Sequence, residues 1–179
     1  MKKIILFTVF CLVFSLGSLS AQNASVEISF AFTKQSGFSS NQYAVWVEDS
    51  RGNLIKTLFA AKFTAEGGWK KRPESIPLWV SKSGLSSLSK KDIDAFSGAT
   101  PKTGTMNYRW DGTDKNGNRM PQGEYKIFLE ATLRGENRVL YSAALNLGSP
   151  IEAEMKPEYF GSGTKERGMI GDIKLLYRP

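Results

Sequence analysis

The chain has 179 residues, a formal net charge of +7 and 41% hydrophobic residues, with no histidine and a single cysteine. Without histidine it cannot offer imidazole ligands to haem or zinc, and one thiol cannot build an iron–sulfur cluster or an internal disulfide. Lysine and arginine form no dense run, so the charge excess indicates a solvated surface and no nucleic-acid partner.

The first residues have the pattern of a secretory signal peptide. Lys2 and Lys3 precede an apolar run at 4–16, and a series of small residues follows. We therefore predict a signal peptide at 1–21. The apolar run is short for a membrane span, so we expect no stable membrane insertion and a periplasmic or otherwise exported protein that is soluble after cleavage.

Cleavage of this leader would also change the chemistry that the chain can offer. Cys11 lies inside the apolar run and is not preceded by a lipobox, so the mature chain would have neither thiol nor imidazole. Loss of Lys2 and Lys3 would lower the formal charge to +5. A redox role would then require an organic cofactor. The remaining length suits one domain with a hydrophobic core.

The mature chain begins with strand patterns. Apolar and polar residues alternate at 26–32, which is the period of a half-buried strand. Two further strands are expected at 42–48 and 54–60. The residues between them, 49–53, have the composition of a tight turn and predict a hairpin.

The strand pattern is interrupted at 62–82, where we predict one long loop containing several glycines and prolines. Trp69 and Trp79 could stack on a flat cofactor ring there, and the basic residues 70–72 could contact a phosphate. Alternatively, the two tryptophans attach the loop to the core and the charges lie in water.

A short helix is expected next. Leu85, Leu88 and Ile93 are spaced for one helical face, and Ser87 or Ser89 could cap its first turn. The helix should end near Phe96 and lead directly into a Ser-Gly-Ala-Thr turn.

The residues from Asp94 to Thr100 have the pattern D-x-x-S-G-A-T. This resembles the acceptor motif on which a bacterial FAD:protein FMN transferase esterifies FMN to a threonine. The resemblance implies that Thr100 carries covalent FMN, and Trp69 and Trp79 would then be candidates to stack on its isoalloxazine ring. Alternatively, the segment is only a polar turn.

The other positions of the motif would serve the same attachment. Gly98 and Ala99 would leave room for the flavin nucleotide. Asp94 would orient the acceptor or help the metal of the transferase, and Ser97 could donate a hydrogen bond to the phosphate. Pro101 follows directly and stiffens the chain at the attachment point.

A second motif, W-D-G-x-D-x-x-G-x-x-x-P-x-G-x-Y, covers residues 110–125. It resembles the immunoglobulin-like (Ig-like) module of flagellar hook-capping proteins. It predicts a strand that places Trp110 in the core, a tight turn at Asn116-Gly117 and a strand at 125–131. The implied fold is all-β, an Ig-like antiparallel β-sandwich formed by residues 22–179 as a single domain.

The second motif also contains an acidic cluster, formed by Asp111, Asp114 and Asn116. Such a cluster could bind calcium, but its spacing does not fit an EF-hand loop. Further strands are expected at 138–147, near 151–155 and at 170–177. The sequence Gly161-Ser162-Gly163-Thr164 is similar to the first motif, but it lacks the alanine and the upstream aspartate, so a loop is expected.

Together these features, over residues 24–148, resemble a family of predicted periplasmic proteins encoded beside the FAD:protein FMN transferase. The resemblance implies an electron-transfer protein whose FMN is reduced by a membrane-bound reductase, for example of PepSY type. The protein would be a carrier and not an enzyme, because the flavin supplies the redox chemistry.

Two other classes remain open from the sequence alone. The chain could be an unmodified Ig-like module that binds a partner protein or a glycan, since a fold does not fix a function. A hydrolase would need paired carboxylates, or a Ser-Lys pair such as Ser97 with Lys90 or Lys91. No spacing in the sequence favours a hydrolase.

Overall fold

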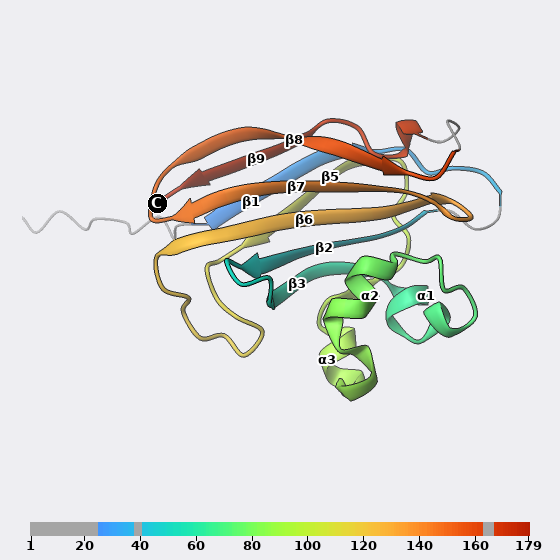
Figure 1. Cartoon of the computed structure of the whole chain (residues 1–179), viewed down its shortest axis with the longest axis horizontal. Coiled ribbons are helices and arrows are strands. Elements are labelled where there is room, and N and C mark those ends of the chain that lie inside the picture. Colours follow the sequence, from blue (N-terminus) through green and yellow to red (C-terminus); the bar gives the residue numbers. More distant parts are fainter. Residues whose placement is uncertain (1–24, 38–40, 163–166) are drawn as a thin grey trace, which may run out of the picture.

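The protein is dominated by one curled sheet (Figure 1). The computed structural model describes residues 25–37, 41–162 and 167–179. Within that part of the chain the strand order is β4-β3-β2-β6-β7-β8-β9-β1-β5. The strands are β1 (Ser25–Phe32), β2 (Gln42–Asp49), β3 (Leu54–Ala61), β4 (Ser97–Gly98), β5 (Gly104–Trp110), β6 (Gly123–Arg134), β7 (Asn137–Leu147), β8 (Ile151–Phe160) and β9 (Ile173–Arg178). The described chain is therefore mostly β, which confirms the coarser part of the all-β prediction, whereas the short helices between β3 and β4 depart from it.

Two features of the sheet differ from a simple antiparallel sandwich. The short β4 pairs parallel with β3, whereas the other described pairs are antiparallel. Strand β8 uses residues 151–155 to pair with β9 and residues 156–160 to pair with β7. It therefore joins the two halves of the sheet into one. The Ig-like arrangement is not established by this connectivity and stays a prediction.

The interior of the curled sheet is filled by the residues that alternate along its strands. Strand β1 contributes Val26, Ile28, Phe30 and Phe32, all 2% exposed or less. Trp110 is fully buried, as the second motif predicts, and its indole nitrogen donates to the carbonyl of Thr113 at 2.8 Å. The same core includes side chains of β2, β6, β7, β8 and β9. Period-two patterning thus accounts for this core directly.

Residues 62–96 form a group of short helices outside the sheet, which we call the helical cap (Figure 1). It contains α1 (Lys62–Ala65), η1 (Gly68–Lys70), α2 (Pro77–Ser83), η2 (Leu85–Ser87) and α3 (Lys90–Asp94). The prediction of one long loop at 62–82 is wrong. Proline suggested a break there, but Pro77 occupies the first turn of α2, where its missing N–H costs nothing. Gly84, with φ of 63°, ends the same helix.

The helix expected before the first motif is present in two pieces. Leu88 is extended and separates η2 from α3. Ser89 caps α3, because its hydroxyl accepts from the amide of Asp92 and the carboxylate of Asp92 accepts from the amide of Ser89. This capping box confirms Ser89, the second of the two serines expected to cap the N-terminus of the helix.

The cap packs on the outer face of β3, β2 and β6. Its apolar cluster combines Trp46 of β2 with Trp79 and Ile76 of the cap, all fully buried. Strand β2 is therefore covered on both faces. A ring contact at 5.1 Å joins Trp46 to Phe128 of β6.

Buried polar side chains of β6 fix the cap. The carboxylate of Glu130 accepts from the amides of Leu78 and Trp79 at 3.2 and 2.9 Å, and Arg138 lies 3.3 Å away. The hydroxyl of Thr132 accepts from the amide of Ile76 at 2.9 Å. These bonds satisfy amide groups at the start of α2, which its own turns cannot satisfy.

The remaining expectations concern the predicted signal peptide, one hairpin and the last strands. The predicted signal peptide and Gly163-Thr164 lie outside the described residues. The hairpin at 49–53 is confirmed, with Asp49 and Asn53 hydrogen bonded at 3.0 Å. Strand β8 extends five residues beyond the expected end, to Phe160. The final strand begins at Ile173, and Ile170 instead forms an isolated bridge with Phe32, next to η3 (Arg167–Met169).

Candidate functional site

The first motif crosses between the two ends of the curled sheet. Asp94 ends α3, and Ser97 and Gly98 form β4, opposite Ala60 and Ala61 of β3. The chain then runs through Thr100 into β5, the strand at the other end of the sheet order. The segment is therefore an edge strand followed by a crossing, where a plain turn was expected.

The motif lies at the surface. Asp94 and Ala99 are exposed, whereas Ser97, Gly98 and Thr100 are partly exposed. Farther along the segment, the hydroxyl of Thr103 accepts from the amide of Lys34 at 3.0 Å and attaches the crossing to the chain after β1. A modifying enzyme could thus approach the motif without unfolding the core.

Gly98 has a packing role that the sequence did not indicate. A Cβ atom at this position would lie 2.7 Å from Cε2 of Phe59, below any normal contact distance. The sequence motif explains this glycine by the close approach of a nucleotide. The structure gives an additional reason within the protein, because β4 passes directly over the ring of Phe59.

Phe59 belongs to an aromatic cluster below the motif. Its ring centroid lies 4.8 Å from that of Tyr43 and 5.3 Å from that of Tyr108. The hydroxyls of Tyr43 and Tyr108 are 2.6 Å apart. Burial raises the pKa of both tyrosines, and for Tyr43 the hydrogen bond with Tyr108 raises it further. The site therefore has an apolar aromatic floor in which both phenols stay protonated at neutral pH.

Sequence reasoning did not identify this cluster as part of the site. Tyr43, Phe59 and Tyr108 lie on three strands, and only the pairing of β3 with β4 and the approach of β5 bring them under the motif. Their positions on separate strands contain no local signal for this neighbourhood.

The two tryptophans of the predicted loop have different environments. Trp79 is fully buried, and its indole nitrogen donates to the hydroxyl of Thr57 at 3.1 Å. Its ring also meets Phe96 edge-on at 5.9 Å. It therefore offers no free face to a cofactor. As the alternative interpretation predicts, it attaches its segment to the core. Trp69 is only partly buried and remains accessible.

Trp69 lines a hollow between α1, η1, η2 and α3. Its volume is about 500 Å³. We call it the cap hollow. It is lined by Ala65, Glu66, Gly67, Trp69, Lys70, Leu85, Ser86, Lys90 and Ile93. The mixture of apolar walls with a few charged groups is typical of a small-ligand site.

The basic residues beside Trp69 are not equivalent. The ammonium of Lys70 lies 5.7 Å from the ring centroid of Trp69. Arg72 is bound to Glu74 at 3.2 Å and its guanidinium lies 5.3 Å from the ring centroid of Phe63. Lys70 and the exposed Lys71 are thus better placed than Arg72 to contact an anionic ligand.

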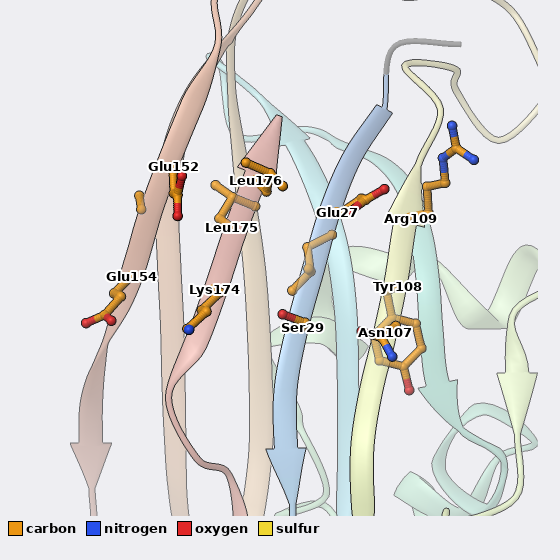
Figure 2. A pocket seen from close by; sticks show the side chains of 12 residues that line it. Glu27, Ser29, Asn107, Tyr108, Arg109, Glu152, Glu154, Lys174, Leu175 and Leu176 are labelled. Atoms are coloured by element: carbon orange, nitrogen blue, oxygen red, sulfur yellow. The ribbon is translucent and has the colours of Figure 1, made fainter. Parts of the chain in front are cut away.

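A second cavity, the strand trough, lies along β8, β9, β1 and β5 (Figure 2). Its volume is about 660 Å³. Glu27, Glu152 and Glu154 give it three carboxylates, and Arg109 and Lys174 supply cations. Its labelled side chains come from neighbouring strands, and the apolar Leu175 and Leu176 lie beside the charged groups (Figure 2).

The acidic cluster of the second motif is used inside its own turn. The carboxylate of Asp114 accepts from the amides of Asn116 and Asn118, both at 2.8 Å. Asp111 lies 3.0 Å from the ammonium of Lys56; burial opposes ionisation, but hydrogen bonds from Thr113 and Lys56 lower its pKa to about 2. Among the residues that the structure describes, no group of three or more histidine, cysteine or acidic residues is placed to hold a metal ion.

No helix in the described ranges is both long and apolar enough to cross a membrane.

Comparisons with known proteins give the family. No curated protein and no solved structure matches the chain. The model of the family described as "Predicted periplasmic protein (DUF2271)" matches residues 23–163. Since this match covers most of the sequence, the chain belongs to this family of predicted periplasmic proteins.

Proposed function

We propose that the protein is a periplasmic electron carrier with FMN esterified to Thr100. The observation that carries this proposal is the position of the motif. Asp94 and Ala99 are exposed and Thr100 is partly exposed, on a segment that β3 holds at the edge of the sheet. A motif inside the core would have argued against modification by an external enzyme.

The attachment would proceed by phosphoryl transfer from FAD. The Oγ atom of Thr100 attacks the phosphorus on the FMN side, a new P–O bond forms, and the bond to the AMP phosphate breaks. AMP leaves, and the hydroxyl proton passes to a base of the FAD:protein FMN transferase or to water. Neither oxidation nor reduction occurs in this step.

The attached flavin would then carry electrons outside the cytoplasm. The donor would be a membrane-bound reductase, of PepSY type or similar, and the acceptor another exported protein. The family description as periplasmic supports this location. The protein itself would hold and orient the flavin without catalysing a reaction of its own.

Intact mass of the exported protein, produced together with an active FAD:protein FMN transferase, tests the attachment. We expect the mass to increase by one FMN residue, with yellow colour that survives denaturation. Thr100→Ala should abolish the increase. Thr105→Ala is a matched control, because it removes an exposed threonine hydroxyl from the neighbouring strand β5, and it should keep the full increase.

An unmodified mass, with the transferase shown to act on another substrate, would contradict the proposal. The second candidate would then be an Ig-like interaction module, and the strand trough favours it because its charged side chains suit a polar partner (Figure 2). An exposed aromatic surface away from the motif would favour that candidate more strongly. In the described ranges the large apolar side chain that is exposed is Phe63 of α1, which belongs to the helical cap. The cap leads into the motif, so Phe63 does not provide an aromatic surface away from it.

A further inference from the structure

We propose that the cap hollow is the docking site for the isoalloxazine ring of the FMN carried by Thr100. This inference rests on the proposed function and adds the ring's location and the residues that control its charge. The hollow is large enough for a fused ring system, since small-ligand pockets typically measure about 300–1,000 Å³.

The walls of the hollow suit a flat apolar ring. Trp69 provides a partly exposed indole. Ala65 and Leu85 are the buried apolar residues of the lining, with 2% and 8% of their surface exposed. Ile93 adds a branched aliphatic side chain. A flavin ring between these groups would stack on Trp69 and exclude water from one face.

The hollow is connected closely to the attachment point. Gly98 pairs with Ala61, and Ala65 follows Ala61 by about one helical turn, roughly 6 Å along the axis. Ile93 lies on α3, which leads directly into the motif. Both walls are therefore held next to β4, two residues before Thr100.

The strand trough is a poorer site for a ring attached at this position. Its nearest lining residue along the chain is Asn107, which lies on β5 beyond the crossing. Its outward side chains are mainly charged, with Glu27, Glu152 and Glu154 among them. These three carboxylates outnumber the two cations of the trough, Arg109 and Lys174, so the trough would favour a negatively charged reduced flavin less than the cap hollow would.

The charges around the cap hollow have the opposite sign. Lys70 and Lys90 line it, and the one carboxylate in its lining, Glu66, lies 3.6 Å from Lys62. A flavin ring held there would gain a negative charge on taking up two electrons from the membrane reductase and one proton from water. Both ammonium groups would stabilise that anion more than the neutral oxidised ring. The hollow should therefore raise the reduction potential of the bound flavin.

Flavin fluorescence of the fully flavinylated protein tests the stacking. We expect weak and strongly polarised emission in the parent protein, because indole quenches an adjacent flavin and the docked ring cannot rotate. Trp69→Ala should increase the emission several-fold and reduce its anisotropy, whereas Trp69→Phe should give an intermediate result. Ser86→Trp should displace the ring by filling the hollow, and Ser81→Trp on the exposed face of α2 is its matched control.

A redox titration of the same samples tests the charges. Lys70→Gln and Lys90→Gln should each lower the midpoint potential, and Lys156→Gln on β8 should leave it unchanged. If Trp69→Ala and Ser86→Trp leave fluorescence and anisotropy at the parent values while intact mass shows complete flavinylation, the docking site is wrong and the proposed function stands. If the parent protein gains no FMN mass, both fail together.

Discussion

The interior of the curled sheet and the helical cap are both well packed, but they are held by different forces. Alternating apolar side chains fill the interior, with Trp110 and the residues of β1 at its centre. The cap has fewer apolar contacts and is fixed by buried polar groups of the sheet, chiefly Glu130 and Thr132. Hydrophobic packing is non-directional, whereas a hydrogen bond sets both position and orientation.

This difference has a consequence for the motif. The chain reaches Thr100 through α3 and β4, so the position of Thr100 depends on the helical cap. The interior holds the larger buried apolar cluster, and the helical cap sets where the motif lies. Variants in each region should show whether the interior and the helical cap respond separately.

The largest effect is expected from Trp110→Ala. The indole is fully buried in the interior, so its loss should lower the free energy of unfolding by about 3–5 kcal/mol, as for other large-to-small core changes. Urea unfolding measures this. Trp79→Ala removes an equally buried indole from the helical cap, so a comparison of the two variants separates the effect of the interior from that of the cap.

Hydrogen exchange should separate these two variants. Trp110→Ala should accelerate exchange throughout the sheet, and Trp79→Ala should accelerate it mainly at 62–96, if the cap opens as a local unit. Identical exchange patterns in the two variants would show that the interior and the cap form one cooperative unit.

Glu130→Ala comes next. It leaves the amides of Leu78 and Trp79 without an acceptor and Arg138 without its partner, so we expect a loss of about 3 kcal/mol at neutral pH. Thermal or urea unfolding measures it. Glu124→Ala changes an exposed carboxylate of the same strand and should have little effect.

Glu130 also predicts a pH dependence. Burial raises its pKa above the ordinary value of 4.5, although the amides of Trp79 and Leu78 and the charge of Arg138 oppose this rise. The folded state then binds the proton more tightly than the unfolded state, so the free energy of unfolding falls as pH rises from the unfolded pKa through the folded pKa. Glu130→Gln should lose this component. Parallel pH profiles of the parent and the variant would contradict it.

A smaller effect is expected from Gly98→Ala, which joins the two regions. The added methyl group would meet Phe59 at 2.7 Å, so overpacking should cost about 1–3 kcal/mol and displace β4. Gly168→Ala, where a Cβ meets nothing within 4 Å, is the control. In a double-mutant cycle with Phe59→Leu, the double variant should lose less than the sum of the single losses. Additive losses would exclude the contact.

The smallest effect is expected from Ser89→Ala. It removes the cap of α3 and should cost about 1 kcal/mol, with increased exchange confined to the residues of α3. Ser87→Ala is the matched control, because its hydroxyl bonds to the carbonyl of Gly84 and caps no helix. Equal losses in both variants would show that the capping box adds nothing beyond an ordinary surface hydrogen bond.

The strands of this protein could be predicted from local patterns, and most of them were. Alternation at 26–32 and 138–147 gives the side of each strand that faces the core, because side-chain direction in a strand depends only on neighbouring residues. The start of α3 is also predictable, because Ser89 is a favoured residue at a helix N-terminus. Helix α2 is harder to predict, because Pro77 by itself suggests a break, although a proline followed by Gly84 is the usual order for a helix start and end.

Local sequence accounts for most of the strands, the burial of Trp110 and the motif around Thr100, since each depends on residues close together in the chain. The tertiary structure alone decided that Gly98 lies over Phe59, that Tyr43 and Tyr108 meet below the motif, and that Trp69 and not Trp79 remains accessible. These contacts join strands far apart in sequence. They depend on which sheet edges meet and on which face the cap covers, and no local period encodes either choice.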